Sequence, residues 1–417
     1  MCARFLRRFR DGVAPVAGDV SVRGPGTRER FDVVIVGAGV AGLSLLRHLL
    51  AEGPATRTIA VIDEGDRRDH NLAFWEGEGE ALALPVEARW RAIRAIGADG
   101  EVVTRLLGEH VYERTHRRAL RAASEAAAAA AGERVAWVAG RCEAIVDGPE
   151  EARARVGERW IVGGWVFDGR PPEVSVDRRR HVALWQRFEG AEVESAGPCF
   201  DPTAATLFDF RVEPAGEVRF AYVLASSPTS ALVEVVAIGA REGGGLGVAL
   251  DEYLGRVAPG AAIVRREGGA SLLTDQPFRR ALGRRVCAIG RRGGRLKPSS
   301  GYALARIERD SAAIVASLAR TGRPFALPRE RAFLRFLDAI LLQVLARRPE
   351  RGAAIFTGLV RRCPGDRLLR FLDERATLGD LVAVIRAVRS WVFVAAIVRW
   401  VVVRAAAALG WRGRIGA

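Results

Sequence analysis

The stretch Phe31–Gly42, FDVVIVGAGVAG, places the strongest constraint on how this chain can fold. Its first six residues are mostly apolar and rich in β-branched side chains, which predicts a buried parallel strand. Gly37, Gly39 and Gly42 then fit the pattern G-x-G-x-x-G, and the apolar run that follows predicts a helix. In such a turn the first glycine allows the tight bend. The second lets the backbone approach a pyrophosphate, and the third lets helix and strand pack closely.

A second strand, predicted over residues 58–64, completes this unit. Its sequence, TIAVIDE, ends in two acids about 20 residues after the glycines, where a carboxylate accepts the ribose hydroxyls of a dinucleotide. The N-terminus of the intervening helix offers free N–H groups to phosphates. A glycine turn without a ligand is the alternative, but the full context favours dinucleotide binding. The contacts expected here are Gly37, Ala38, Gly39, Val40, Ala41, Gly42, Asp63 and Glu64.

The chain is strongly basic, with a formal net charge of +15 over 417 residues. Lys297 is the only lysine, so nearly all of the positive charge is arginine, and it is scattered along the sequence. Because no basic patch is interleaved with aromatic residues, we expect no nucleic-acid partner. An acidic membrane surface is a better match for this charge.

The cysteines and histidines indicate no metal site. The five cysteines include no C-x-x-C pair, and the five histidines are dispersed. We therefore expect reduced, intracellular thiols and no metal. Residues 1–30 are rich in arginine, glycine and proline and lack the apolar core of a secretory signal, so a disordered basic leader is expected.

Three further segments lie where cofactor contacts are expected. Residues 69–75, DHNLAFW, form either a surface connection or a loop along the cofactor or its substrate, in which Asn71 would take part. Arg117 precedes a helix predicted over residues 118–132 and either contacts phosphate or is a solvated charge. Asp168, in VFDGR, either abuts the cofactor or stands in a plain turn.

From about residue 181 to 277 the helical periodicity gives way to short alternating strands. This pattern predicts an antiparallel sheet that forms a second domain inserted in the first. Two of its strands form a hairpin around residues 226–229, SSPT, and the second carries Glu234 within the apolar run 231–237. A carboxylate among apolar residues is costly unless it is hydrogen-bonded or protonated. Exposure of Glu234 on the solvent face of the sheet is the alternative.

The parallel-sheet pattern returns at residues 285–290, RVCAIG, before a glycine-rich loop and a helix predicted over 303–318. In flavoproteins a late strand, loop and helix of this kind places N–H groups at the pyrophosphate and the flavin ring. The contacts expected there are Gly290, Gly294, Pro298, Gly301 and Tyr302. Earlier in the chain, Pro85 suits the first turn of a short helix predicted over residues 86–96.

The C-terminal region, residues 326–417, is expected to be helical, with helices over 336–345, 367–371 and 378–388. The apolar stretch 391–411 is long enough to span a bilayer, but Arg399 and Arg404 lie in its middle. Each would cost roughly 2.5–3.5 kcal/mol at the bilayer centre. We therefore expect an interfacial helix with its tryptophans at the level of the lipid headgroups. A soluble helix packed on the sheet is the alternative.

Five stretches together resemble the lycopene cyclase family, bacterial flavoproteins that close β-ionone rings on carotenoids. They are VVIVGAGVAG with the later VIDE, HNLAFW, VFDGR, FAYVLASSPTSALVEV, and GRRGGRLKPSSGY with its helix. Their order and spacing agree with the family over roughly residues 31–390. In the family a strand, a Ser-Pro-Thr turn and a second strand with a key glutamate stand as Tyr222 to Glu234 do here.

The resemblance implies an α/β fold with a Rossmann-type FAD-binding domain of the para-hydroxybenzoate-hydroxylase-like class. The implied parts are that domain (31–180 and 278–325), an inserted antiparallel β substrate domain (181–277) and a helical, membrane-associating C-terminal region (326–417). It also implies reduced FAD, NADPH as the reductant, and peripheral attachment to the cytoplasmic face of the membrane. The substrate would be lycopene or a related acyclic carotenoid. The oligomeric state stays open.

The implied reaction is a proton-initiated ring closure to a β-ionone ring with no net redox change. An alkene is a very poor base, so the acid must be strong when used and water must be excluded. Glu234 is the expected donor, because a carboxylic acid in an apolar strand stays protonated until it is needed. Asp209 and Glu267 are reserve acids, each more simply explained by a structural role.

Two positions depart from the family pattern. The second acid that usually follows the key glutamate is Val235 here, and the aromatic or histidine residue before the proline is Lys297. The first departure leaves open a flavin-binding member that has lost its chemistry. The remaining alternative is an FAD-dependent monooxygenase or reductase of the same fold that acts on an apolar isoprenoid. A cyclase, unlike a monooxygenase, needs no oxygen.

Overall fold

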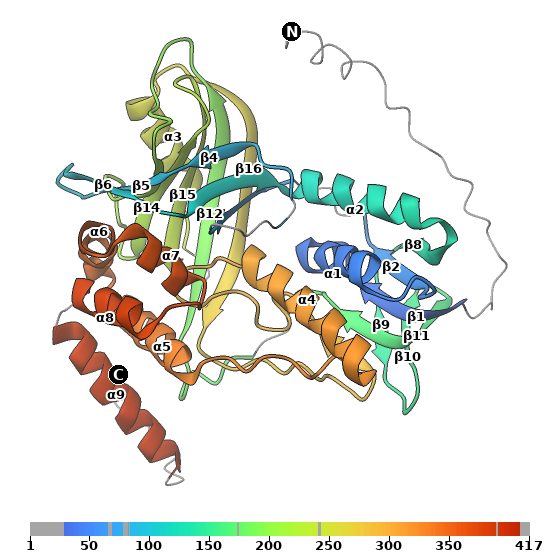
Figure 1. Ribbon diagram of the computed structural model, residues 1–417. Helices are drawn as coiled ribbons and strands as arrows, with labels where there is room; N and C mark the ends of the chain where they lie inside the picture. The colour runs from blue at the N-terminus through green and yellow to red at the C-terminus, as the bar shows by residue number, and fades with distance from the viewer. Residues whose placement is uncertain are drawn as a thin grey trace.

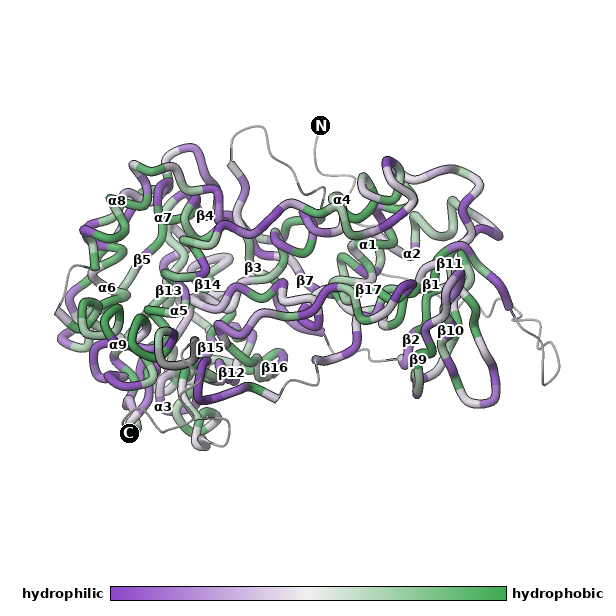
Figure 2. Tube along the Cα trace, turned by 90° about the horizontal axis from the view of Figure 1, so that it is seen from below, coloured by the Kyte–Doolittle hydropathy of each residue, from purple (hydrophilic) through white to green (hydrophobic). Residues whose placement is uncertain are grey.

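The computed structural model describes residues 29–65, 69–77, 82, 84–172, 175–240, 243–388 and 391–408 (Figure 1). The leader predicted over residues 1–30 lies outside the described residues, except for the last two, which begin the first strand. In the described part of the chain, two seven-stranded sheets form two halves that lie side by side, with a three-stranded sheet between them (Figure 2). The predicted α/β class is therefore confirmed.

The first sheet is built on β1 (Glu29–Val36), which pairs in parallel with β2 (Ile59–Asp63) and β11 (Arg159–Asp168). Its remaining strands are β8 (Val135–Ala139), β9 (Ala144–Val146), β10 (Ala152–Val156) and β17 (Val286–Ala288). Three helices cover one face: α1 (Val40–Glu52), α2 (Arg117–Ala131) and α4 (Leu304–Thr321) (Figure 1). Val33 and Ile35 face these helices, whereas Val34 and Val36 pack on the opposite side. A strand buried on both faces needs such a continuous apolar run.

The second sheet contains the strands predicted between residues 181 and 277. Its order is β16 (Ala262–Thr274), β12 (Ala183–Glu194), β15 (Ser230–Gly239), β14 (Val218–Ala225), β13 (Ala205–Asp209), β5 (Ala92–Ile96) and β6 (Val102–Leu106). The first five strands pair antiparallel to one another. The last two come from a much earlier part of the chain, and β5 pairs in parallel with β13. The sheet therefore extends beyond the segment expected to form the inserted domain.

Two local predictions near the three-stranded sheet were wrong. The helix predicted over residues 86–96 is instead β4 (Ala88–Trp90) followed by β5. Trp90 is buried in the pairing of β4 with β7 (Val111–His116), and such tertiary contacts outweigh local helical spacing. The expected loop at residues 69–75 contains β3 (Asn71–Glu76), which pairs with β7 over six residues.

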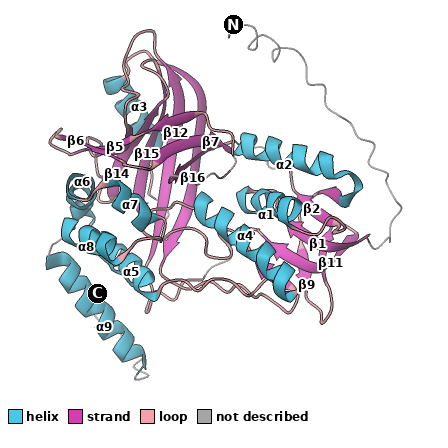
Figure 3. Ribbon diagram, in the orientation of Figure 1, coloured by secondary structure: helices cyan, strands magenta, loops and turns pink. Residues whose placement is uncertain are grey.

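Helices cover both faces of the second sheet. On one face lies α3 (Leu246–Val257), a helix that was not predicted because the glycines at 243–245 before it indicate a loop. The opposite face packs against α5 (Ala332–Arg347) and α6 (Gly352–Arg362). The chain continues with α7 (Gly365–Leu372), α8 (Leu378–Ala387) and α9 (Trp391–Ala408) (Figure 3). The helical C-terminal region was thus predicted, except for α6.

The only lysine of the chain ties the loop before α4 to the C-terminal helices. Lys297 is fully buried, and its Nζ lies 3.0 Å from an Asp338 carboxylate oxygen on α5 and 3.5 Å from Glu374. The ammonium also lies 5.4 Å from the centre of the Phe371 ring. A buried charge persists only when it is paired in this way. The departure from the family pattern at this position is therefore accommodated by Asp338.

We expect Lys297→Met to lower the free energy of unfolding by about 3–5 kcal/mol, because Asp338 is left as an uncompensated buried carboxylate. The double variant Lys297→Met/Asp338→Leu removes both charges and should recover most of that loss. Urea unfolding followed by circular dichroism measures both changes. A double variant as unstable as the single one would contradict this explanation.

Candidate functional site

The glycine turn after β1 has an open approach to the N-terminus of α1. Gly37 has a φ of +98°, a left-handed conformation that favours glycine. Gly39 is the N-cap of α1, and a Cβ built on it would meet no atom within 4 Å. A Cβ on Gly42 would instead lie 2.0 Å from the carbonyl oxygen of Gly37. The three glycines thus allow a bend, an open approach and close helix packing, as a pyrophosphate site requires.

The late loop and the start of α2 close around this turn. Gly290, two residues after β17, has a φ of +57°, and a Cβ there would lie 2.5 Å from the Cβ of Ala41. Arg117 is buried and donates from Nη2 to the carbonyl oxygen of Ala38 at 3.2 Å. Val40, the first residue of α1, is half-buried. The structure therefore brings the predicted contacts of the two distant segments together at one place.

The acids predicted to contact the cofactor have different surroundings. Asp63, at the end of β2, accepts a hydrogen bond from Arg121 at 2.6 Å, whereas its neighbour Glu64 is exposed. Asp168 is held by Arg170 at 2.9 Å and by Arg292 at 2.8 Å. The carboxylate of Glu64 is therefore accessible to a ligand at the end of β2, whereas the carboxylate of Asp168 is already paired with two arginines.

The remaining predicted contacts lie along the loop between β17 and α4. Gly301 has a φ of +76°, and a Cβ on it would lie 1.8 Å from the side-chain oxygen of Gln186 on β12. Gly294 packs against Phe278, and Pro298 lines a separate pocket beside the outer surface of α4. Tyr302 points away from that pocket into an aromatic cluster with Trp75 and Tyr112. The loop therefore connects the first sheet to the second.

Two glutamates face each other across β12, near one edge of the second sheet. The strand register places Gly190 of β12 between Glu234 of β15 and Glu267 of β16. A Cβ on Gly190 would lie 2.8 Å from Glu234 Cγ and 3.4 Å from Glu267 Cγ, so only glycine leaves both side chains enough room. The two carboxyl groups are within hydrogen-bonding reach of each other. Two carboxyls can share a hydrogen bond only if one of them carries the proton.

Glu234 is the member of the pair that holds the proton. Burial raises its pKa well above the ordinary value of a glutamate, and the hydrogen bond and charge of Glu267 raise it further. Glu267 is fixed from its other side by N–H donors. The backbone and side-chain nitrogens of Asn71 lie 3.2 Å and 3.0 Å from one of its oxygens, and Arg265 lies 2.9 Å from it. All three N–H groups therefore point to the same oxygen of Glu267.

This arrangement explains the departure at Val235. Successive side chains of a strand point to opposite faces, and β15 pairs without a register shift through this region. Val235 is therefore fully buried beneath α3, on the face of the sheet opposite to Glu234. An acid at that position could not reach Glu234. The second carboxyl group on the Glu234 face comes instead from Glu267, two strands away.

Three tyrosine hydroxyl groups meet beside the pair. The hydroxyl oxygen of Tyr112 lies 2.7 Å from that of Tyr222 and 2.6 Å from that of Tyr302. Tyr222 stands directly opposite Glu234 in the pairing of β14 and β15. Burial raises the pKa of Tyr112 and Tyr222 well above the usual value and raises the pKa of Tyr302 to about 12. All three are thus neutral near pH 7.

The surroundings of Glu234 are otherwise apolar and aromatic. Along β15 its neighbours on the same face, Leu232 and Val236, belong to two hydrophobic clusters. The Trp75 ring contacts the Tyr302 ring edge-on at a centroid distance of 4.9 Å. The electron-rich faces of such rings attract cations. Two carboxyl groups and several aromatic rings therefore converge on one place.

The third predicted acid, Asp209, lies elsewhere. Its two oxygens accept hydrogen bonds from Arg211 at 2.9 Å and 2.6 Å, and the Tyr253 hydroxyl on α3 donates to it at 2.7 Å. It is fully buried on the α3 side and does not join the glutamate pair. Asp209 is thus explained by its structural contacts.

Several residues of this site were not identified from the sequence. Gly190 had a detectable signal, since a glycine inside a strand often marks a close approach. Arg265 and Tyr112 gave none, because their roles depend on strand pairings between distant segments.

Comparison with protein families decides the assignment. The family model described as lycopene cyclase protein matches residues 32–400, most of the chain. The chain belongs to the lycopene cyclase family. No curated protein matches the sequence.

Solved structures agree with the flavoprotein fold of this cyclase-family protein. A geranylgeranyl bacteriochlorophyll reductase-like protein from Thermoplasma acidophilum has a TM-score of 0.57 at 12% identity, with 88% of this chain and 98% of that chain covered. A p-nitrophenol 4-monooxygenase from Pseudomonas putida has a TM-score of 0.57 at 14% identity, with coverage of 84% and 99%. A flavoprotein/dehydrogenase from Cytophaga hutchinsonii has a TM-score of 0.55 at 11% identity, with coverage of 86% and 99%. The fold is the predicted para-hydroxybenzoate-hydroxylase-like class.

The residues of this cyclase-family protein fit FAD. The open space at Gly39 and the uncapped N-terminus of α1 suit the pyrophosphate, and the exposed Glu64 suits a ribose. The loop from Gly290 to Tyr302 runs from this turn to the aromatic cluster beside Glu234. A flavin held along this loop would therefore extend from the first sheet toward the glutamate pair.

We expect Gly39→Val to abolish FAD binding while the protein stays folded. The φ of −80° at Gly39 suits any residue, and the new side chain would meet open space unless the pyrophosphate is present. Flavin absorbance and melting temperature of the purified variant measure the two effects. Gly42→Ala is the contrasting variant, because its methyl group would clash with the Gly37 carbonyl and should destabilise the fold. A Gly39→Val protein with wild-type flavin content would refute the assignment.

Proposed function

We propose that this protein closes a β-ionone ring on the acyclic end of lycopene or a related carotenoid, with Glu234 as the proton donor. The observation that carries the proposal is the pair of hydrogen-bonded carboxyl groups in apolar and aromatic surroundings, on the sheet face toward which the cofactor loop runs. Ring closure of an alkene needs a proton, a cation-stabilising environment and exclusion of water. The pair and the rings beside it supply the first two.

In the proposed reaction, Glu234 donates its proton to a carbon of the terminal C=C bond. A new C–H bond forms and leaves a tertiary cation, which the neighbouring C=C bond attacks to close the six-membered ring. Transfer of a proton from the ring back to the Glu234 carboxylate restores a C=C bond and balances the proton that was added. The reaction therefore changes neither the formula nor the oxidation state of the carotenoid.

Glu267 and its partners would stabilise the cation. After Glu234 gives up its proton, two carboxylates face the cation, and Arg265 and Asn71 share part of the resulting negative charge. The rings of Tyr222 and Tyr302 add electron-rich faces. When bound, reduced FAD would add a further negative charge near the cation, and we propose NADPH as its reductant.

Two alternatives from the sequence remain distinguishable. A monooxygenase or reductase would use the flavin for redox chemistry and would not need a protonated carboxyl group in an apolar strand. A member without chemistry is not implied by Val235, because that side chain lies on the other face of the sheet. The decisive assay supplies lycopene and dithionite-reduced FAD with and without oxygen. Ring formation without oxygen favours the cyclase.

In that anaerobic assay, Glu234→Gln should lower ring formation by about 100- to 10,000-fold, the usual contribution of general acid catalysis, while FAD stays bound. The amide keeps the shape of the side chain but cannot protonate an alkene. Chromatography of the carotenoid products measures the loss. Asp209→Asn is the control acid, and it should lose stability without a selective loss of turnover. Intact ring formation in Glu234→Gln would place the donor elsewhere.

Glu267→Gln should act differently, through the pKa of Glu234. Glu234 is active when protonated, so activity falls as the pH rises through its raised pKa. Removing the Glu267 carboxylate takes away one cause of the raised pKa, and the alkaline limb of the pH–rate profile should move to lower pH. An alkaline limb that does not move would show that the two groups are not coupled.

We also propose that the protein lies peripherally on the cytoplasmic face of the membrane. Among the described residues, no single helix meets the length and hydropathy of a span; α8 and α9 do so only as a pair bent by 115°. Large apolar side chains are exposed on three helices: Phe333 of α5, Leu378, Val382 and Ile385 of α8, and Trp391, Val394, Ile397, Val398, Val401 and Val402 of α9. An apolar surface of this kind suits insertion into the headgroup region.

Removal of residues 391–417 should move the protein from the membrane fraction to the soluble fraction, because it deletes much of that apolar surface. Alkaline carbonate should extract the intact chain, as it does peripheral proteins. Western blotting of the separated fractions measures both effects. Resistance of the intact chain to carbonate would indicate a true span and contradict peripheral attachment.

A further inference from the structure

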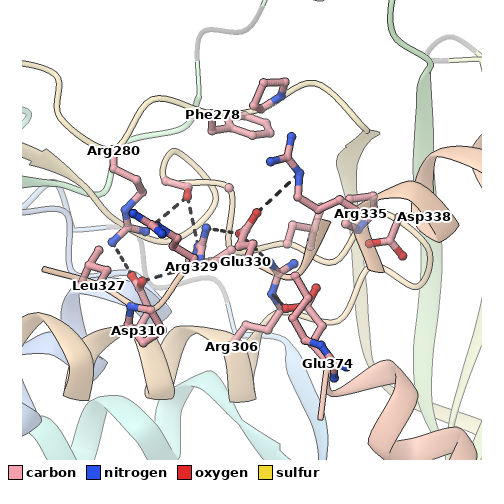
Figure 4. A pocket seen from close by; sticks show the side chains of 18 of the residues that line it. Phe278, Arg280, Arg306, Asp310, Leu327, Arg329, Glu330, Arg335, Asp338 and Glu374 are labelled. Carbon is pink, nitrogen blue, oxygen red and sulfur yellow. Dashed lines mark hydrogen bonds and ion pairs between the residues drawn. The ribbon is translucent and has the colours of Figure 1, made fainter. Parts of the chain in front are cut away.

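A pocket of about 460 Å³ lies apart from the turn and the glutamate pair (Figure 4). It is bounded by the outer side of α4, the start of α5, the segment that follows β16 and residues 293–298 of the loop before α4. The other side of α4 faces α1, where Ser311 and Ser44 share a hydrogen bond at 3.1 Å and Ile314 is buried. Arg306 and Arg309 line the pocket from the side of α4 that does not face α1. The pocket is therefore separate from the pyrophosphate turn.

The charges that line this pocket are not balanced. Seven arginines face five carboxylate side chains. Glu330 alone is shared by Arg295 at 2.6 Å, Arg306 at 3.1 Å and Arg335 at 3.9 Å, as Figure 4 shows for the labelled residues Arg306 and Arg335. Arg329 makes no hydrogen bond or ion pair to any described residue. An anion bound in the pocket would accept hydrogen bonds from these arginines and balance their excess charge.

One donor in the pocket is both buried and unused. Arg306 is 8% exposed; its Nη2 contacts Glu330 and its Nε contacts Glu374, but its Nη1 has no hydrogen-bond partner among the described residues. A buried N–H group without a partner is costly. Burial also lowers the pKa of the nearby Arg295, so a second guanidinium group of this pocket is poorly solvated. A guanidinium group in this state is suited to a phosphate oxygen.

The pocket adjoins the apolar surface of the C-terminal helices. Arg404, near the end of α9, lies 3.9 Å from Asp275 of the pocket lining, and the Trp400 ring contacts Phe336 of α5 at 5.0 Å. Phe333, in the first turn of α5, is 47% exposed and lies two residues before Arg335. Exposed apolar residues next to arginines are the pattern of a surface at the level of lipid headgroups.

We propose that this pocket binds the phosphate of an anionic lipid headgroup, with Arg306, Arg329 and Arg335 as its principal donors. The proposal rests on the proposed attachment of the protein to the membrane. A soluble phosphate ester offers the same chemistry, so the experiment must separate the two sources.

The full-length protein is tested for sedimentation with vesicles of phosphatidylcholine, alone or mixed with phosphatidic acid. The pocket variant is Arg329→Ser/Arg335→Ser, which changes two exposed arginines. The control is Arg320→Ser/Arg323→Ser, which removes the same charge from exposed positions outside the pocket lining. The pocket variant should lose about 30-fold in affinity for vesicles with phosphatidic acid, the amount expected for two arginines near a membrane. An equal loss in the control would overturn the proposal.

Calorimetry with a soluble, short-chain phosphatidic acid keeps this result independent of membrane attachment. The wild type and control should bind it, and the pocket variant should not. If the intact protein ignores vesicles but binds this ligand only through an intact pocket, membrane attachment fails while the phosphate site stands. Inorganic phosphate or adenosine 2′-phosphate binding as tightly as the short-chain lipid would overturn the lipid assignment.

Discussion

The hydrogen bond between Glu234 and Glu267 is the interaction on which the rest of this structure depends. Neither carboxylate could be buried alone in this position without a large cost. The sheet makes the pair possible, because Gly190 on the intervening strand leaves the space between them unfilled. A proton on Glu234 avoids the cost of two buried negative charges, and burial together with the neighbouring Glu267 raises the pKa of Glu234 so that it keeps this proton.

The two halves of the protein meet at this pair. Asn71 reaches Glu267 from the three-stranded sheet, and Tyr302 reaches the tyrosine cluster from the loop before α4. That loop begins at Gly290 beside the pyrophosphate turn and carries Lys297, whose buried pairing with Asp338 joins it to α5. A displacement of the cofactor loop would therefore disturb the tyrosine hydroxyls and the acid together. The C-terminal helices cover the sheet on the same side and place an exposed apolar surface beside it.

The sequence predicts those parts of the site that depend on local pattern. The turn from Gly37 to Gly42 could be predicted because its strand, glycines and helix are contiguous, and Glu234 stood out because one carboxyl group interrupts an apolar run. Glu267 could be named only as a reserve acid. Its position beside Glu234 depends on β15 and β16 both pairing with β12, which the local sequence does not indicate. Pairing with a distant strand also brings residues 92–106 into the second sheet. The helix predicted over residues 86–96 therefore does not form. Val235 appeared to be a missing acid only because adjacent positions in sequence lie on opposite faces of a strand.

The most direct test of this account is infrared difference spectroscopy of the purified protein, which reports the carbonyl stretch of a protonated carboxylic acid. The wild type minus Glu234→Gln spectrum should contain one such band at neutral pH, because the raised pKa of Glu234 keeps its carboxyl group protonated. In Glu267→Gln the same band should vanish at a lower pH than in the wild type. A wild type without this band at neutral pH, or a band that survives in Glu234→Gln, would contradict the central claim that Glu234 stores the proton.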